Sequence, residues 1–455
     1  MQKFPFEPTK GQVGFFHKVD QLLEENGLPV LLVKGYAGTG KTTVISTLVQ
    51  VLPSFNMKFV LLAPTGRAAK VMSSYSQRMA FTIHKKIYKQ VAEGEVGLKF
   101  KRQKNYAKNT VYIVDESSMI NEDAGFGQKG LLTDLVDYVF SDSTNKLILV
   151  GDDAQLPPVG QLLSPALDNE ALQLKFSLKT DEVTLTEVMR QEVDSGILVN
   201  ATNLRNQLST SNPRIAISTA FNDTFKMTGA RMEDGIRYAY DNVGIENTII
   251  LCRSNKTANA YNQYIRNAIH FYESEIEAGE FLMVVRNNYI YSPGDTTGGF
   301  IANGDFLEIM KIVNFEEMHG LRFATLQLRL ADYPSENSFE AKVILDTLYS
   351  ESPAMTQEQN HALYQSVSAD YADLTATKKK EAIKSDPYLN ALQVKFAYAI
   401  TCHKAQGGQW ATVFVDQGYL KEDSIDKEYV RWLYTAITRA TSQLFLVNFD
   451  KNLFA

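Results

Sequence analysis

The sequence predicts an α/β protein built on parallel sheets. Short runs of aliphatic and β-branched residues are spread along the 455 residues, and most do not alternate with polar residues, as expected for strands buried on both faces. Stretches of helical composition, such as residues 41–51 and 68–75, lie between several of these runs. Alternating strand and helix is typical of βαβ units, whose ligands bind at the carboxyl ends of the strands. The predicted strands cover residues 30–33, 59–62, 111–114, 147–150, 248–251, 396–400, 413–415 and 444–447.

Composition narrows the class of protein. The length predicts about two to four domains, and the 44% hydrophobic and 22% charged fractions are ordinary for a globular protein. A basic segment followed by an apolar core is missing at the N-terminus, and no apolar run approaches ~18 residues, which disfavours secretion and membrane spanning. Cys252 and Cys402 offer neither a disulfide framework nor the ligand spacing of a zinc site. We expect an intracellular, cytoplasmic location.

The first predicted strand runs into a glycine-rich turn and then a helix. Residues 35–42 fit the pattern G-x-x-x-x-G-K-[ST] of a phosphate-binding P-loop. Glycines let backbone N–H groups turn inward around an anion, and the following helix N-terminus adds a partial positive charge. Lys41 is placed to contact the β- and γ-phosphates and Thr42 to ligate Mg²⁺. The chain is therefore predicted to bind ATP and Mg²⁺, with nucleotide contacts from Gly35, Gly38, Thr39, Gly40, Lys41, Thr42 and Thr43.

Polar residues follow two later strands. The run 111–114 ends in Asp115 and Glu116, which suit a magnesium ligand and a base that polarises the attacking water. The run 147–150 ends in the polar turn 151–160, where Gln155 could hydrogen-bond the γ-phosphate or that water.

Three regions interrupt the alternation of strand and helix. Residues 85–110 are basic in a chain of net charge −6 and predict a small hairpin, either a solvated basic face or a phosphate-binding surface. Residues 281–345 contain short strand-like runs separated by turns, which predict a small barrel or sheet. Residues 355–390 are polar and helical in composition.

The ordered motifs resemble those of a superfamily-1 helicase of the B type, closest to the RecD/Dda-like group and similar to the Pif family. The resemblance covers nearly the whole chain. It rests on residues 9–12, 35–43, 61–70, 82–84, 115–119, 151–160, 185–191, 303–305, 401–407 and 434–440.

The resemblance implies two RecA-like P-loop NTPase lobes with ATP between them. Domain 1A would cover residues 1–190, with a pin-like hairpin insertion at about 85–110. Domain 2A would cover residues 191–280 and 391–455, and an insertion domain 2B, residues 281–390, would hold an SH3-like barrel and a helical extension.

The resemblance also assigns residues to the ATP site. Gln12 would read the adenine, and Thr42 and Asp115 would hold the metal. Arg190 and Arg439 would reach the γ-phosphate as arginine fingers, which suits the charge that builds up during phosphoryl transfer. The implied catalytic set is Lys41, Asp115, Glu116, Gln155, Arg190 and Arg439.

Single-stranded DNA would run across both lobes. Hydroxyl and imidazole groups at strand ends suit backbone contacts that do not read sequence. An apolar side chain at the hairpin, Leu98 or Phe100, would wedge against the duplex junction. The implied DNA contacts are Pro64, Thr65, Thr82, His84, Phe100, Thr401 and His403.

The predicted function is a monomeric, bacterial or phage-encoded ATP-dependent DNA helicase that moves 5′→3′ on single-stranded DNA and unwinds forks, with the direction taken from the resemblance alone. Replication, recombination and repair all stay open as its pathway. A translocase that removes bound proteins with little unwinding is one alternative. An ATP-gated DNA clamp is another, although Glu116 and both arginines argue against it. RNA is not excluded by stacking and phosphate contacts alone.

Overall fold

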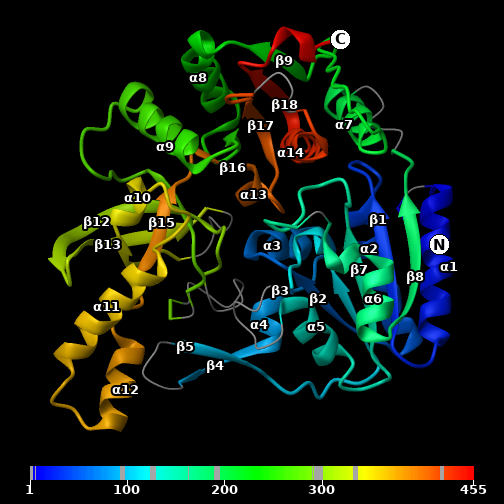
Figure 1. The fold of residues 1–455 in the computed structure, drawn as a ribbon, viewed down its shortest axis with the longest axis horizontal. Helices are drawn as coiled ribbons and strands as arrows, with labels where there is room; N and C mark the ends of the chain where they lie inside the picture. The colour runs from blue at the N-terminus through cyan, green and yellow to red at the C-terminus, as the bar shows by residue number, and fades with distance from the viewer. Residues whose placement is uncertain are drawn as a thin grey trace.

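Two α/β lobes and a small barrel make up the computed structural model (Figure 1). It describes residues 4–5, 7–92, 98–122, 130–161, 163–188, 195–288, 290–291, 301–331, 337–420 and 425–455, with the backbone alone for residues 90–92 and 98–100. The predicted fold class is confirmed.

The first lobe is a parallel six-stranded sheet in the order β3-β2-β6-β7-β1-β8. Its helices lie in two layers, since alternate residues of the buried strands pack into two separate cores. One core contains α1, α2 and α3, and the other contains α4, α5 and α6. The strands are β1 (Pro29–Gly35), β2 (Lys58–Ala63), β3 (Ala80–Thr82), β6 (Thr110–Val114), β7 (Lys146–Gly151) and β8 (Lys179–Leu185). The helices are α1 (Lys10–Glu24), α2 (Lys41–Val51), α3 (Gly66–Ser76), α4 (Ile83–Ile87), α5 (Leu131–Val139) and α6 (Asn169–Phe176).

The second lobe is a parallel five-stranded sheet in the order β16-β10-β17-β18-β9. The helices α7 and α14 cover the face of this sheet that is turned toward the first lobe. The helices α8 and α9 pack into a hydrophobic core that they share with the barrel. The strands are β9 (Thr224–Met227), β10 (Thr248–Cys252), β16 (Ala399–Thr401), β17 (Trp410–Asp416) and β18 (Ala440–Val447). The helices are α7 (Gly196–Gln207), α8 (Met232–Val243), α9 (Asn255–Tyr264), α13 (Cys402–Ala405) and α14 (Lys427–Ile437).

The barrel is closed by strands from distant parts of the chain. It contains β11 (Phe281–Val284), β12 (Phe306–Met318), β13 (Leu321–Leu330), β14 (Phe339–Ile344) and β15 (Leu392–Phe396). The short helix α10 (Asp346–Tyr349) follows β14, and α11 (Gln357–Asp370) and α12 (Ala376–Ser385) extend outward beside the barrel (Figure 1).

The single strand predicted over residues 396–400 is wrong. Residues 392–393 pair with β14 and residues 394–396 with β11 in the barrel, whereas residues 399–401 pair with β10 in the second lobe. Between them, Ala397 N–H donates to the Phe281 carbonyl, and the Tyr398 carbonyl accepts from Ile250 N–H. The chain therefore changes sheets within two residues, and the barrel includes strand residues beyond the expected boundary at 390.

The basic segment contains an antiparallel hairpin of β4 (Tyr88–Ala92) and β5 (Leu98–Arg102). Its base is fixed to the first lobe, because Arg102 pairs with Asp137 at 2.8 Å and the Tyr88 hydroxyl donates to Asp134 at 2.9 Å. Figure 1 shows the hairpin running from α4 toward the side where α12 lies. Its tip, residues 93–97, and the side chains of Leu98 and Phe100 are outside the described part of the chain.

Candidate nucleotide site and strand-binding edge

The P-loop links β1 to α2 with the backbone that its glycines allow. Gly38 and Gly40 have φ of 73° and 78°, a region that favours glycine. A Cβ on Gly35 would lie 2.8 Å from the Lys41 stem, so a side chain there would displace the lysine. The Lys41 ammonium lies across the loop and donates to the carbonyl oxygens of Gly35 at 2.8 Å and Tyr36 at 3.0 Å.

Gln12 joins the start of α1 to the P-loop. It completes a capping box with Thr9, whose N–H donates to Gln12 Oε1 at 3.0 Å. Its Nε2 donates to the Thr39 carbonyl at 3.1 Å, and the residue is fully buried. Glu187, just after β8, accepts from Gly11 N–H at 2.8 Å. Gln12 thus contacts the backbone of the loop that would hold the triphosphate.

Asp115 and Glu116 lie where β6 ends. Asp115 accepts hydrogen bonds from the Tyr75 hydroxyl at 2.8 Å and from Glu116 N–H at 2.8 Å. Burial raises the pKa of Asp115, and these two hydrogen bonds and the Lys41 charge oppose the rise. Burial also raises the pKa of Glu116, which the charge of Arg439 from the second lobe opposes most. Glu116 adopts a left-handed backbone (φ 52°), a strained conformation for a residue other than glycine.

The donors near the P-loop fit Mg²⁺. This hard ion takes one or two protein oxygens together with phosphate oxygens and water, and the Thr42 hydroxyl and the Asp115 carboxylate are of that kind. Each Asp115 oxygen accepts one of these two hydrogen bonds and keeps a lone pair for a ligand. Throughout the described residues, no group of three or more His, Cys, Asp or Glu side chains is arranged to hold a metal by itself.

Gln155 sits in the loop after β7 and is 6% exposed. Its Oε1 has no hydrogen-bond partner among the described residues. A cavity of about 80 Å³ adjoins it, lined among others by Lys34, Ser118 and Arg431. The side chain is thus buried beside polar space with an acceptor still to be satisfied.

Arg439 is held inside the second lobe. Its guanidinium donates to the carbonyls of Thr435 at 3.1 Å and Gly408 at 3.2 Å and to the Thr438 hydroxyl at 3.2 Å. It is 4% exposed, and its charge acts on Glu116 across the cleft. Arg190, the other expected finger, lies outside the described residues.

The predicted DNA contacts of the first lobe lie where β2 and β3 end. Thr65, next to Pro64, caps α3 by accepting from Ala68 N–H at 3.2 Å, and Thr82 caps α4 by accepting from Lys85 N–H at 3.2 Å. A capping hydroxyl still has its own proton to donate to a phosphate. Burial lowers the pKa of His84 to about 4, so its ring is neutral at pH 7.

The second lobe adds Thr401 and His403 at the start of α13. Burial lowers the pKa of His403 as well. The two lobes meet beside these residues, because a Cβ on Gly407 would lie 3.3 Å from the Thr65 hydroxyl oxygen and 2.9 Å from Ala68 Cβ. The structure therefore places Thr65 of the first lobe against the turn at Gly407 of the second lobe.

Helix α3 makes contacts that sequence reasoning missed. The Arg67 guanidinium lies over the rings of Phe306 in the barrel and Trp410 in the second lobe, at 4.4 and 4.1 Å from their centroids, and the two rings meet edge to face. Lys70 pairs with Asp305 in the barrel at 3.2 Å. A groove of about 830 Å³ runs along the same helix, and it is lined by Arg67, Lys70, Val71, Ser73, Ser74, Gln77, Arg78, Met79, Glu246, Asn247, Phe281, Phe306, Ala331 and Gln409. Among the predicted DNA contacts whose side chains the structure describes, none lines this groove.

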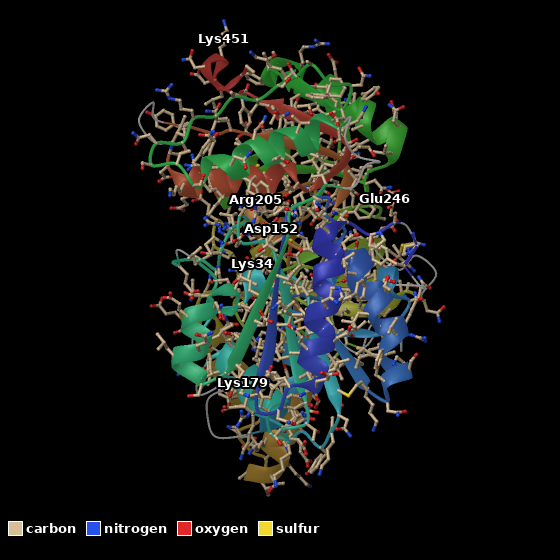
Figure 2. The ribbon with its side chains drawn as sticks, turned by 90° about the vertical axis from the view of Figure 1, so that its right-hand side faces the viewer. Lys34, Asp152, Lys179, Arg205, Glu246 and Lys451 are labelled. Atoms are coloured by element: carbon tan, nitrogen blue, oxygen red, sulfur yellow. The ribbon has the colours of Figure 1, made fainter. Side chains whose placement is uncertain are left out.

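Arg205 is a further residue that no motif indicated. It lies on α7 of the second lobe and pairs with Asp152 and Asp153 of the first. Figure 2 shows Arg205 and Asp152 where the two lobes meet, with Lys34 just below them. Only the folded chain brings these residues together, since α7 follows the loop by more than forty positions.

Comparisons with known proteins agree with this geometry. Residues 17–214 match the family model of an AAA domain, and residues 396–447 match the UvrD-like helicase C-terminal domain. The chain is 25% identical to the uncharacterized protein R530 of Acanthamoeba polyphaga mimivirus over 94% of this chain and 97% of that one. It is 32% identical to the ATP-dependent DNA helicase dda of Enterobacteria phage T4 over 44% of this chain and 42% of that one, so the match spans less than half of either.

The fold is similar to that of a Pif1 helicase from Bacteroides in complex with ADP-AlF3 and ssDNA. The TM-score is 0.50 at 16% identity, and the match covers 99% of this chain and 95% of that one. Across the described residues no helix is both long and apolar enough to cross a bilayer. The two domain matches follow the order of the two lobes, and the chain is similar to ATP-hydrolysing superfamily-1 helicases of the B type in the RecD/Dda-like group, to which the Pif family is related.

Proposed function

We propose that this chain is an ATP-driven motor that moves 5′→3′ along single-stranded DNA and separates duplex DNA ahead of it. The observation that carries the proposal is the arrangement across the cleft. The phosphate-binding and acidic groups of the first lobe face Arg439 of the second, whose charge acts on Glu116. Next to them, Thr65 lies against the Gly407 turn at the edge where both lobes end their strands.

The chemistry follows from the residues around the P-loop. Lys41 would hold the β- and γ-phosphates, and Gln12 would contact the adenine. Thr42 and Asp115 would hold Mg²⁺, which neutralises phosphate charge when bound. Glu116 would accept the proton of the attacking water, for which a raised pKa is suited.

Closure of the second lobe would complete the site. Arg439 and Arg190 would then stabilise the charge that develops on the transferred phosphoryl group. Arg439 would exchange its bonds to the Thr435 and Gly408 carbonyls for bonds to phosphate oxygens. Hydrolysis would thus depend on the placement of the lobes.

Strand movement would use contacts from both lobes. Pro64, Thr65, Thr82 and His84 would hold the strand on the first lobe, and Thr401 and His403 would hold it on the second. A neutral His84 can donate one hydrogen bond without adding charge. The hairpin 88–102, with Phe100, would separate the strands. Alternating grip by the two lobes would give one step per ATP.

The remaining assignments are part of the same proposal. We assign residues 1–190 to domain 1A, and residues 191–280 and 391–455 to domain 2A. The strand β15 (Leu392–Phe396) is the exception, because it closes the barrel and goes with the insertion, domain 2B. The working unit would be a monomer inside the cell. Pif1 helicases of similar fold act on forked DNA or bind single-stranded DNA, which supports DNA as the substrate here.

The deciding experiment compares fluorescent forks with a 5′ or a 3′ tail, while ATP turnover is followed in parallel. We expect unwinding of the 5′-tailed fork, and hydrolysis that single-stranded DNA stimulates. Unwinding of the 3′-tailed fork alone would overturn the direction. Fast DNA-stimulated hydrolysis with little unwinding of either fork would favour the protein-removing translocase.

A further inference from the structure

The loop after β7 is fastened to the second lobe by its acidic residues. Asp152 is 1% exposed, accepts from the Tyr434 hydroxyl at 2.5 Å, and is ion-paired with Arg205. Asp153 pairs with the other arm of the same guanidinium. Arg205 comes from α7 and Tyr434 from α14, so both partners belong to the second lobe. Figure 2 shows Arg205 next to Asp152.

The backbone of this loop has partners in the second lobe too. Leu156 N–H donates to the Thr435 hydroxyl at 2.8 Å, and the Leu156 carbonyl accepts from Gln406 Nε2 at 2.8 Å. The Gln155 carbonyl accepts from Arg431 at 3.4 Å. The residues on both sides of the Gln155 side chain are thus bound to elements of the other lobe.

The same two side chains also touch the P-loop. The Tyr434 hydroxyl accepts from Ala37 N–H at 3.2 Å, and the Arg205 guanidinium lies over the Tyr36 ring, 3.8 Å from its centroid. Tyr434 is 1% exposed and the Arg205 side chain 9%. A buried guanidinium donates charge-assisted hydrogen bonds from N–H groups that are fixed in one plane. A lysine ammonium cannot reproduce this paired arrangement.

We propose that Arg205 and Tyr434 are positioning residues that clamp the loop 152–156 to the second lobe, so that Gln155 moves with that lobe and reaches the γ-phosphate only when the lobes are closed. The clamp acts through Gln155 and not by touching the phosphate itself. It deepens the proposed function and rests on it, because it names how lobe movement would reach the hydrolytic site.

Kinetics test the clamp first. Arg205→Lys keeps the positive charge but loses the guanidinium that pairs with Asp152 and Asp153 at once, and Tyr434→Phe removes only the hydroxyl. We expect each to lower kcat of DNA-stimulated ATP hydrolysis at least tenfold, while KM for ATP stays within about threefold because Lys41 and Thr42 are untouched. The double variant should be no slower than about twice the worse single variant, since the residues act as one unit. Arg322→Lys, which alters an exposed ion pair of the barrel, is the matched control and should leave kcat unchanged.

A measurement without hydrolysis separates the clamp from the proposed function. Dyes on Leu174→Cys in α6 and Tyr238→Cys in α8 report the distance between lobes, because both sites are exposed and the natural cysteines are buried. We expect the parent protein without nucleotide to populate both an open and a closed distance, and a non-hydrolysable ATP analogue to close it fully. Arg205→Ala should give an open population that a non-hydrolysable ATP analogue closes again, which would also show that the variant is folded.

The outcomes are distinct. A parent protein without DNA-stimulated hydrolysis would overturn the proposed function, and the dye distances would still decide on the clamp. If Arg205→Ala is as closed as the parent protein without nucleotide, the clamp is overturned, as it is if Arg205→Lys and Tyr434→Phe keep the parent kcat.

Discussion

Replacing Arg67 by Ala should weaken the junction of α3, the barrel and the second lobe. The residue is 9% exposed, and its guanidinium carbon lies 4.4 Å from the Phe306 centroid and 4.1 Å from the Trp410 centroid. Alanine removes both stacked contacts and the packing of the arginine stem.

The geometry sets the size of the effect. A cation–π contact contributes about 0.5–1 kcal/mol at an exposed site and about 2 kcal/mol when desolvated. With two rings and little exposure, we expect a loss of about 2–3 kcal/mol. We expect the loss to lower the stability of the contact between the first lobe, the barrel and the second lobe. The first lobe itself should keep its stability, because β2, β6 and the core beneath α3 remain intact. Arg67→Lys should recover less than half of this loss, since an ammonium lacks the planar, weakly hydrated face that a guanidinium packs on aromatic rings.

Tryptophan fluorescence gives a direct assay. The chain has two tryptophans, Trp410 and Trp432, so a Trp432→Phe background isolates the ring that Arg67 covers. Arg67→Ala should shift the native emission of Trp410 and lower the free energy of the first urea transition by about 2–3 kcal/mol. Arg78→Ala is the matched control, because Arg78 is exposed near the end of the same helix.

One result would refute this reasoning. If Arg67→Ala keeps both the emission and the first transition of the background protein, the stacked arginine does not stabilise the junction. A shift of equal size in Arg78→Ala would refute it too, because the effect would then be general to the surface of α3.

Three further predictions concern the sites themselves. Lys41→Ala should abolish ATP hydrolysis and keep ATP-independent binding of single-stranded DNA, measured by anisotropy; DNA-stimulated turnover in this variant would contradict the site. Gly407→Ala should lower affinity for single-stranded DNA, because the new Cβ would lie 2.9 Å from Ala68 at a φ of 76°. Gly320→Ala is the control, because Gly320 has a φ of 74° and open space around it. The variant has the same backbone strain without a steric clash, and it should keep the parent affinity for single-stranded DNA. The pKa of His84 is about 4 in the fold against about 6.5 unfolded. The unfolded chain thus binds the extra proton, and stability should fall by about 1–3 kcal/mol as pH drops from 6.5 toward 4. His84→Gln should flatten this slope in urea titrations, and an unchanged slope would contradict the assignment.

The sequence was most informative where one short segment contains both the structure and the chemistry. Residues 35–42 predict the turn, the helix start and the lysine together, and the structure has α2 over Lys41–Val51 as expected. Residues 111–116 likewise combine a buried strand with its terminal carboxylates. Strand β8 was missed because it lies at the sheet edge and reads Lys-Thr-Asp-Glu-Val-Thr-Leu, with few apolar residues.

Contacts between distant segments could not be predicted. Arg205 reads as an ordinary surface arginine on a helix, and only folding places it against Asp152. Tyr75 reads as a core tyrosine of α3, yet its hydroxyl reaches Asp115. The crossing from β15 to β16 was missed because Ala397 and Tyr398 continue the apolar run of both strands, and nothing local marks the change of sheet.

Helix α3 also sets a mechanical limit on the molecule. It is a rigid rod of about 16 Å by its rise per residue, with Thr65 at one end and Tyr75 near the other. Arg67 and Lys70 fix the first turns to the second lobe and the barrel, and the Tyr75 hydroxyl holds a carboxylate oxygen of Asp115. A rod cannot tilt at one end alone. A force on the Thr65 end of α3, where DNA is proposed to bind, therefore also displaces the Tyr75 hydroxyl at the other end. No loop lies between the two residues that could absorb the movement.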